Sequence, residues 1–206
     1  MITTDTGALS NGRARPASSA TKGTLDEQLI VRIAGGNRLA MRVLFARFNE
    51  RVYRFALRLT DDVGLAEDVV SEVFFEVWRK AATFEGRSQV STWILGIARN
   101  KALDARKTRS TDGWDEDAAQ AVEDPAGNPE VEYQRKDLGA VMRKCLAQLS
   151  PAHREIVDLV YYHGKSIDEV AKITGAGQAT VKTRMFYARK HLGELLAAYG
   201  ITTAAA

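Results

Sequence analysis

The sequence predicts an all-α protein with two helical domains, joined by a flexible acidic linker. Apolar residues recur at helical spacing through residues 24–107 and again through 131–200, without the alternation of half-buried strands. Only four prolines occur, and the hydrophobic content of 45% is enough for two small cores. Residues 108–132, between the two blocks, carry a net charge of −7 and show little periodicity.

The overall net charge of +3 conceals a segregation of charge along the chain. Residues 24–107 carry +3 and residues 133–206 carry +5, which suggests a polyanionic partner. The lone cysteine, Cys145, excludes an internal disulfide and fits a reducing cytoplasm. No apolar run of about 18 residues occurs, and the polar N-terminus has no signal-peptide core. We therefore expect a cytoplasmic protein that does not insert into a membrane.

The N-terminal block begins after a tail rich in Ser, Thr, Ala and Gly, residues 1–23, which we expect to be disordered. Residues 25–34 then predict a helix that ends at Gly35 and Gly36. A longer helix is expected over residues 38–60, with Leu39, Val43 and Leu44 among its inward residues. The other side of this helix bears a row of arginines. Such a row most often forms a face exposed to solvent, although a functional role stays open.

A third helix, over residues 65–81, carries Asp68, Glu72 and Glu76 at intervals of four, which form an acidic ridge. No histidine precedes His153, so a bundle-type metal site is not supported. The ridge either faces a basic protein partner or is simply exposed to solvent.

Residues 83–107 form the most informative stretch of the N-terminal block. A loop with Arg87 and Ser88 precedes a helix for which Ser91 or Thr92 is the expected N-cap. Arg99, Asn100 and Lys107 lie away from its apolar stripe, together with Trp93. Cations can meet phosphates, and a flat ring and an amide can meet an unstacked base. The alternative is a solvated basic face with Trp93 packed against a neighbouring helix.

The C-terminal block predicts a helix-turn-helix. A helix over residues 131–149 is followed by one that starts at Ser150-Pro151 and stops near His163. Ser166 then caps a short helix, Gly175 breaks it, and a second helix covers residues 178–198.

The surface of this last helix is suited to a DNA groove. Lysine reaches guanine edges, an aromatic ring can meet a thymine methyl, and flanking arginine meets phosphate. The alternative is a helix-turn-helix that contacts protein. The candidate DNA-contacting residues are Lys182, Thr183, Arg184, Phe186, Tyr187 and Lys190.

Enzymatic chemistry finds no support in the sequence. Cys145, His153 and His163 lack metal-ligand spacing, and neither a phosphate-binding loop nor a Ser/His/Asp pattern occurs. We therefore expect no enzymatic activity, no cofactor, no metal and no small-molecule substrate.

Four segments together resemble a bacterial extracytoplasmic-function (ECF, group IV) sigma factor of the sigma-70 family. Residues 48–80 (FNERVYRFALRLTDDVGLAEDVVSEVFFEVWRK) and 84–104 (FEGRSQVSTWILGIARNKALD) resemble sigma region 2. Residues 149–171 (LSPAHREIVDLVYYHGKSIDEVA) and 180–192 (TVKTRMFYARKHL) resemble sigma region 4. The family often has Gln at Ser71 and Gly at Ala179, which bears on the polymerase contact and on the start of the recognition helix.

The resemblance implies a role for each part of the chain. Residues 24–107 would bind core RNA polymerase and the minus-ten element, and residues 131–200 the minus-thirty-five element. The acidic linker, residues 108–130, would thread the polymerase. Core polymerase would meet Asp68, Glu72, Phe75 and Glu76. The minus-ten element would meet Arg87, Ser88, Trp93, Arg99, Asn100 and Lys107.

The expected function is that of a sigma factor that directs core RNA polymerase to promoter DNA and assists melting, under the control of an anti-sigma factor. The alternative is a stand-alone helix-turn-helix transcription regulator, which would bind duplex DNA without polymerase.

Overall fold

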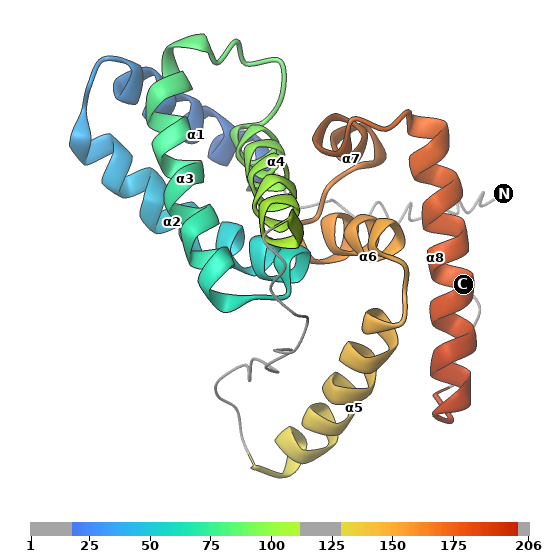
Figure 1. Ribbon diagram of the computed structural model, residues 1–206. Coiled ribbons are helices and arrows are strands. Elements are labelled where there is room, and N and C mark those ends of the chain that lie inside the picture. Colours follow the sequence, from blue (N-terminus) through green and yellow to red (C-terminus); the bar gives the residue numbers. More distant parts are fainter. Residues whose placement is uncertain (1–17, 112–128, 202–206) are drawn as a thin grey trace, which may run out of the picture.

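The computed structural model describes residues 18–111 and 129–201 (Figure 1). Within these residues every regular element is helical, which confirms the all-α prediction. Most of the predicted tail and linker lies outside the described residues. The elements are α1 (Ser18–Ala34), α2 (Arg38–Thr60), α3 (Val63–Lys80), the 3-10 turn η1 (Ala81–Thr83), α4 (Val90–Thr111), α5 (Pro129–Ala147), α6 (Pro151–Val157), the π-helical segment η2 (Asp158–Tyr162), α7 (Ile167–Thr174) and α8 (Gln178–Ala198).

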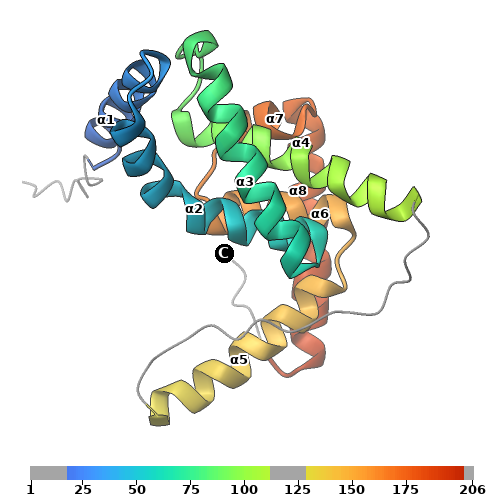
Figure 2. The same cartoon turned by 60° about the vertical axis from the view of Figure 1, so that its left-hand side comes forward.

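Helices α1–α4 form an N-terminal bundle in which α2, α3 and α4 pack on one another and α1 packs against α2 (Figure 2). The buried face of α2 follows four-residue steps through Ala40, Leu44, Phe48 and Val52. The sequence placed this face about one residue off at its N-terminal end, since Leu39 is 64% exposed and Val43 is also exposed.

Helix α2 begins at Arg38 as predicted, whereas the other three helices of this bundle begin earlier than the sequence predicted. α1 begins at Ser18, inside the segment expected to be a tail, and α3 begins at Val63 because Asp62 caps it by accepting from the Leu65 amide. α4 begins at Val90, and the amides of Thr92 and Trp93 already bond to the Gln89 carbonyl. The expected N-cap at Ser91 or Thr92 was therefore wrong by two or three residues, since Gln89 holds that position, and both hydroxyls take part in other contacts.

Helices α5–α8 form the C-terminal half, and its helix-turn-helix confirms the predicted pattern. Ser166 caps α7 in a reciprocal arrangement with Glu169, whose carboxylate accepts from the Ser166 amide. Gly175 then adopts a left-handed conformation with φ of 70°, which a residue with a side chain rarely takes. This turn sets α8 across α7, and α8 is held in place by buried Val181 and Met185.

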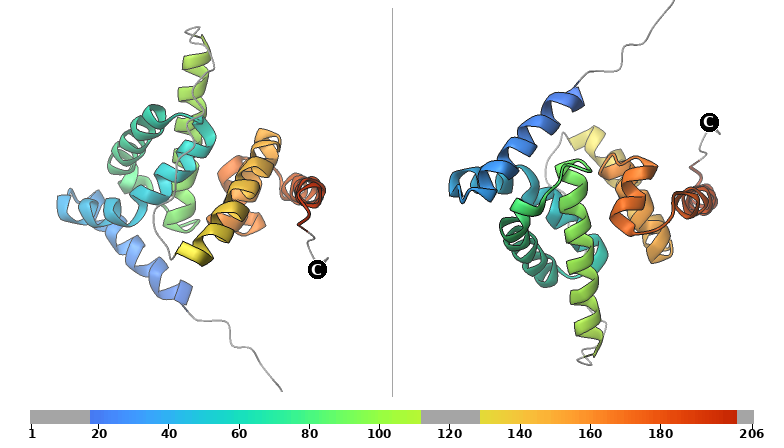
Figure 3. Two further views of the ribbon diagram at one scale, coloured as in Figure 1. Left: turned by 90° about the horizontal axis from the view of Figure 1, so that it is seen from below. Right: turned by 90° about the horizontal axis from the view of Figure 1, so that it is seen from above.

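The two halves pack directly against each other, which the sequence did not predict. α4 contacts α7, and α2 contacts α6. Buried residues of both halves join in one apolar cluster. Figure 3 shows α6 and α7 beside α4, with α8 at the outer edge beyond them. The protein is therefore closed around α4, and α8 presents its outer side away from the N-terminal bundle.

Phe55 lies at the centre of this arrangement. Its side chain is fully buried in α2, and its ring meets the His163 ring of the C-terminal half edge-on, with centroids 5.2 Å apart.

We expect Phe55→Ala to lower the free energy of unfolding by about 3–5 kcal/mol, because the substitution leaves a cavity in addition to removing buried apolar surface. The matched control is Phe75→Ala, which removes a ring that is 65% exposed and should change stability by no more than about 0.5 kcal/mol. Urea denaturation followed by circular dichroism measures both, and equal losses would contradict the assigned core.

Candidate nucleic-acid and polymerase interfaces

The outer face of α8 gathers the residues predicted to read the minus-thirty-five element. Lys182, Thr183 and Lys190 are exposed, and Phe186 and Tyr187 are 65% and 53% exposed. The two rings meet edge to face with centroids 5.4 Å apart. Helix α8 buries Val181, Met185 and Ala188 on the opposite side, so the five exposed side chains form one continuous face. Exposed aromatic rings among cations match the requirements of a DNA-reading helix.

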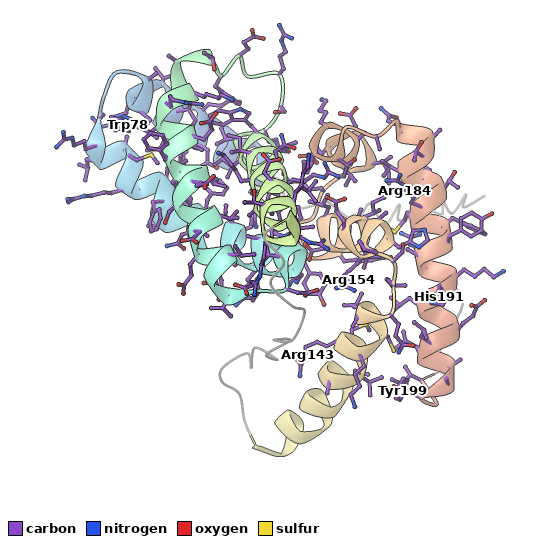
Figure 4. All side chains as sticks on the ribbon, in the orientation of Figure 1. Trp78, Arg143, Arg154, Arg184, His191 and Tyr199 are labelled. Carbon is purple, nitrogen blue, oxygen red and sulfur yellow. The ribbon has the colours of Figure 1, made fainter. Side chains whose placement is uncertain are left out.

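Arginines lie at the edges of this face. Arg184 is half-buried, and Figure 4 shows it on the N-terminal half of α8, with His191 farther along the helix. Arg189 sits over the ring of Tyr161, with its guanidinium carbon 5.7 Å from the ring centroid. Arg184 at the edge is in the position where a phosphate contact is expected.

The loop before α4 carries the first two residues predicted to meet the minus-ten element. Arg87 is largely exposed and pairs with Glu85, and Ser88 is half-buried. Gly86 turns the loop with a φ of 68°. The loop stands between α3 and α4 at one end of the bundle (Figure 1).

Trp93 packs against the loop rather than standing free. Its ring lies 5.0 Å from that of Phe84 at 48°, and its side chain is partly buried against the apolar cluster. This geometry matches the alternative in which Trp93 is tucked against a neighbour, although the neighbour is a loop residue and not a helix. Asn100 and Lys107 lie on the same side of α4, about two and about four turns beyond Trp93, and both are exposed.

The remaining residue of this predicted set, Arg99, is already engaged by the C-terminal half. Its Nε donates to Glu155 Oε1 at 2.5 Å, and its Nη2 lies 3.4 Å from Glu155 Oε2. Glu155 is buried in α6, and the Arg99 side chain is 21% exposed. Arg99 therefore reaches solvent only in part while the two halves are packed together.

A second polar contact joins the start of α4 to α7. Thr92 Oγ1 donates to Glu169 Oε1 at 2.6 Å. Lys165 Nζ donates to Ser91 Oγ at 2.6 Å, to Thr92 Oγ1 at 2.9 Å and to Glu169 Oε1 at 3.1 Å. Because these groups satisfy one another, the Lys165 side chain is tolerated at 3% exposure.

Burial and hydrogen bonding act in opposite directions on the two charged groups of this network. Burial alone would raise the pKa of Glu169, but hydrogen bonds from Thr92, the Ser166 amide and Lys165 outweigh it and lower that pKa to about 2. Burial lowers the pKa of Lys165, and its contact with Glu169 opposes that shift. The carboxylate is therefore held strongly in its charged form.

Helix α3 presents three of the four residues predicted to bind core polymerase. Asp68 and Phe75 are exposed, and Glu72 is exposed while its carboxylate lies 2.9 Å from Lys101 Nζ on α4. Glu76 is only 7% exposed and pairs with Lys80 at 2.6 Å and Arg79 at 2.7 Å. Hydrogen bonds from Lys80 and then Arg79 lower the pKa of Glu76. Glu76 thus pairs within its own helix, and the exposed members of the predicted set on α3 are Asp68, Glu72 and Phe75.

The sequence analysis missed the residues that connect the halves. In the sequence, Glu155, Lys165 and Glu169 carry no signal of a role across the two domains. In the part of the chain that the structure describes, no cluster of three or more potential metal ligands occurs. The described helices include none that is long and apolar enough to cross a membrane.

This fold defines a class: an all-helical protein that joins a four-helix N-terminal bundle to a helix-turn-helix unit. Family models match both parts. Residues 44–111 match sigma-70 region 2, and residues 140–192 match sigma-70 region 4.

Curated relatives match across both parts. The ECF RNA polymerase sigma factor SigL of Mycobacterium tuberculosis is 32% identical over 170 residues, which cover 79% of this chain and 92% of SigL. The ECF RNA polymerase sigma factor SigK of Mycobacterium bovis is 28% identical over 173 residues, covering 82% and 92%. The chain therefore belongs to the ECF RNA polymerase sigma factors of the sigma-70 family, which are transcription initiation factors.

Solved structures share the fold. CnrH in complex with the cytosolic domain of CnrY is 22% identical with a TM-score of 0.61, covering 84% of this chain and 98% of that one. The sigma factor RpoE in complex with the anti-sigma factor NepR from Bartonella quintana is 25% identical with a TM-score of 0.61, covering 76% and 96%.

The lowered pKa of Glu169 predicts how acid affects the protein. Because the folded-state pKa of about 2 lies below the ordinary value of 4.5, the charged carboxylate stabilises the fold above about pH 4.5. This contribution is lost as the pH falls from about 4.5 towards about 2. We expect the stability difference between wild type and Glu169→Gln to be largest near neutral pH and to shrink across that window. Urea denaturation at a series of pH values measures it.

Asp168→Asn is the matched control, since it neutralises an exposed carboxylate on the same helix that pairs with Lys172 and Gln178. An exposed pair contributes little, so this variant should differ from wild type by less than about 1 kcal/mol. A stability difference for Glu169→Gln that stays constant from neutral pH down to pH 2 would contradict the assignment.

Proposed function

We propose that this protein binds core RNA polymerase, directs it to promoters with defined minus-ten and minus-thirty-five elements, and assists DNA melting. The observation that supports this most strongly is the outer face of α8, where two exposed aromatic rings lie among cations and hydroxyls on the second helix of a helix-turn-helix. In a member of the sigma family, that face is suited to reading the minus-thirty-five element in the major groove.

The N-terminal bundle carries the other two proposed contacts. Arg87, Ser88 and Asn100 lie on the loop and along α4, where a base flipped out of the minus-ten element can be bound. Flipping costs a few kcal/mol, so stacking and hydrogen bonds are needed to offset it. On α3, Asp68, Glu72 and Phe75 form an acidic and aromatic surface suited to a basic coiled coil of the polymerase.

Regulation by an anti-sigma factor is part of the proposal. It is supported by the likeness to RpoE, whose structure contains the anti-sigma factor NepR. The exposed apolar residues of the described surface, among them Phe75 and Trp78, offer an area that such a partner can cover. The protein acts in the cytoplasm, where core polymerase is found, and catalyses no reaction of its own.

Run-off transcription tests the proposal. Purified core polymerase is assayed with and without this protein on a library of candidate promoter fragments. Transcripts that depend on the protein support the sigma role, and alignment of their upstream sequences gives both promoter elements. Absence of such transcripts, together with failure to co-migrate with core polymerase, would favour a stand-alone regulator that binds duplex DNA alone.

On the recognition helix, we expect Lys182→Ala to weaken promoter use by about 1–3 kcal/mol while binding to core polymerase is retained. The reason is the loss of one contact to a base edge. Competition run-off assays measure the first effect, and co-migration with core polymerase measures the second. Lys144→Ala, which removes an exposed lysine of α5, is the matched control. Equal loss of core binding in Lys182→Ala would count against the recognition role.

On α4, we expect Asn100→Ala to impair promoter opening more than formation of the closed complex, because the amide is proposed to bind the flipped base. Permanganate reactivity of unpaired thymines measures opening, and gel retardation of the holoenzyme measures closed-complex formation. Exposed Thr108, on the same helix, provides the control Thr108→Ala. Similar losses in both assays would argue against the flipped-base assignment.

A further inference from the structure

Tyr161 and Arg189 join the π-helical segment η2 to the side of α8. The guanidinium carbon of Arg189 lies over the Tyr161 ring, 5.7 Å from its centroid, and both side chains remain exposed to solvent. Arg189 forms no ion pair with any residue in the part of the chain that the structure describes. Neither residue belongs to the set of DNA contacts predicted on α8, so this pair is still without a role.

The Tyr161 ring is held in a fixed direction by the turn that carries it. In η2 the amide of His163 donates to the carbonyl of Asp158, five residues earlier, at 3.1 Å. Leu159 and His163, on either side of the tyrosine, are buried, whereas Tyr161 is 58% exposed. The wide turn therefore anchors the backbone on both sides and directs the ring outwards, where it meets Arg189.

A guanidinium group that lies over a ring keeps its hydrogen-bond donors. The ring face attracts the cation through its negative electron density, and a planar guanidinium can stack along the ring. The N–H donors of the group point outwards in its own plane, so stacking engages none of them. Arg189 is thus held at one place on the surface while its donors stay free for an anion.

The position of Arg189 on α8 indicates which anion it meets. Lys182 and Arg189 are seven residues apart with Phe186 between them, so the three side chains follow one another along about two turns of the same side of the helix. The first residues of a recognition helix reach base edges, and side chains farther along it lie nearer to the DNA backbone. Arg189 is in the second half of α8, between Arg184 and His191 of Figure 4. A phosphate is therefore its expected partner.

We propose that Arg189 is a further contact of α8 with the DNA backbone, and that Tyr161 is a positioning residue that holds its guanidinium ready for a phosphate. This inference rests on the proposed function, since it requires that α8 reads the minus-thirty-five element. It extends the DNA-contacting surface from the helix-turn-helix to η2.

The Tyr161 ring orders the arginine before DNA binds. A long side chain that moves freely in solution gives up its rotamer freedom when it binds a phosphate. The ring already restricts that freedom in the unbound protein, so less is lost on binding. Tyr162, the neighbouring tyrosine, instead lies under Arg58 of α2, whose guanidinium carbon is 4.1 Å from the ring centroid. Of these two tyrosines, only Tyr161 holds an arginine of the recognition helix.

Gel retardation at a series of salt concentrations tests the proposal. The full chain, together with core polymerase, is bound to a promoter duplex selected by run-off transcription. If no transcript forms, the chain alone on a random-sequence duplex takes its place. Each lost phosphate contact reduces the steepness of log K against log salt by about 0.9. Contacts made by the polymerase are common to all variants and cancel in the comparison.

We expect Arg189→Gln to weaken duplex binding and to reduce the steepness of the salt dependence by about 0.9. Lys144→Gln, which removes an exposed cation of α5, is the matched control and should leave the salt dependence unchanged. A salt dependence for Arg189→Gln equal to that of Lys144→Gln would overturn the phosphate contact.

We expect Tyr161→Leu to weaken duplex binding by about two- to fivefold, the effect of losing one exposed cation–π pair. Tyr161→Phe, which keeps the ring, should bind as wild type does, and so should the neighbouring control Tyr162→Leu. In the Arg189→Gln background Tyr161→Leu should have no further effect, because the two residues act on one contact. Circular dichroism shows that each variant is folded.

Three results would overturn the positioning role: failure of Tyr161→Phe to restore binding, an equal loss in Tyr162→Leu, or additive effects of Tyr161→Leu and Arg189→Gln. A failure of the sigma role appears separately, as absence of run-off transcripts. The comparison on the random-sequence duplex then decides the proposal by itself.

Discussion

The packing of α4 is the constraint on which the rest of the structure depends. Ile94, Leu95, Ala98 and Ala102 are almost fully buried, which fixes the helix in the N-terminal bundle. Another side of α4 meets α7, and Arg99 reaches α6. Small residues at 98 and 102 allow neighbouring helices to approach closely, so α4 has little freedom to move. The surface proposed to meet DNA is consequently built on a firmly held helix, as a site proposed to bind an unpaired base requires.

Local signals account for the parts of the fold that the sequence predicted. The helix-turn-helix follows from Ser166, Gly175 and the apolar spacing of α8, all of which act within a few residues. The face of α2 was predicted only in part: Leu44 is buried as expected, but Leu39 and Val43 are apolar and exposed, and only the packed bundle shows that Ala40 is buried in their place. Trp93 is a similar case, since its contact with Phe84 depends on the path of the loop between them.

The contacts between the two halves lay beyond prediction for a different physical reason. Arg58 and Asp158 are 100 residues apart, and any of the other carboxylates could have paired with this arginine as well. The apolar cluster that both halves share brings these particular residues together, and the spacing of charges along the sequence does not indicate which pairs form. The same applies to Glu155 and Lys165, which look like ordinary helix and loop residues until α4 is placed against them.

The π-helical segment η2 has a consequence for how this protein can change in length. A wide turn of this kind accommodates one residue more than an α-helical turn, and here it places Asp158 and His163 inward while Tyr161 and Tyr162 face outward. Deleting one residue within 158–162 would bring Asp158 and His163 to a spacing of four residues, at which an ordinary α-helix also places two side chains on one face. The extra residue is therefore taken up within the turn itself, while the positions of α7 and α8 are set by their packing on α4 and α6. A gain or loss of one residue at this point is thus a local change that the rest of the fold can absorb.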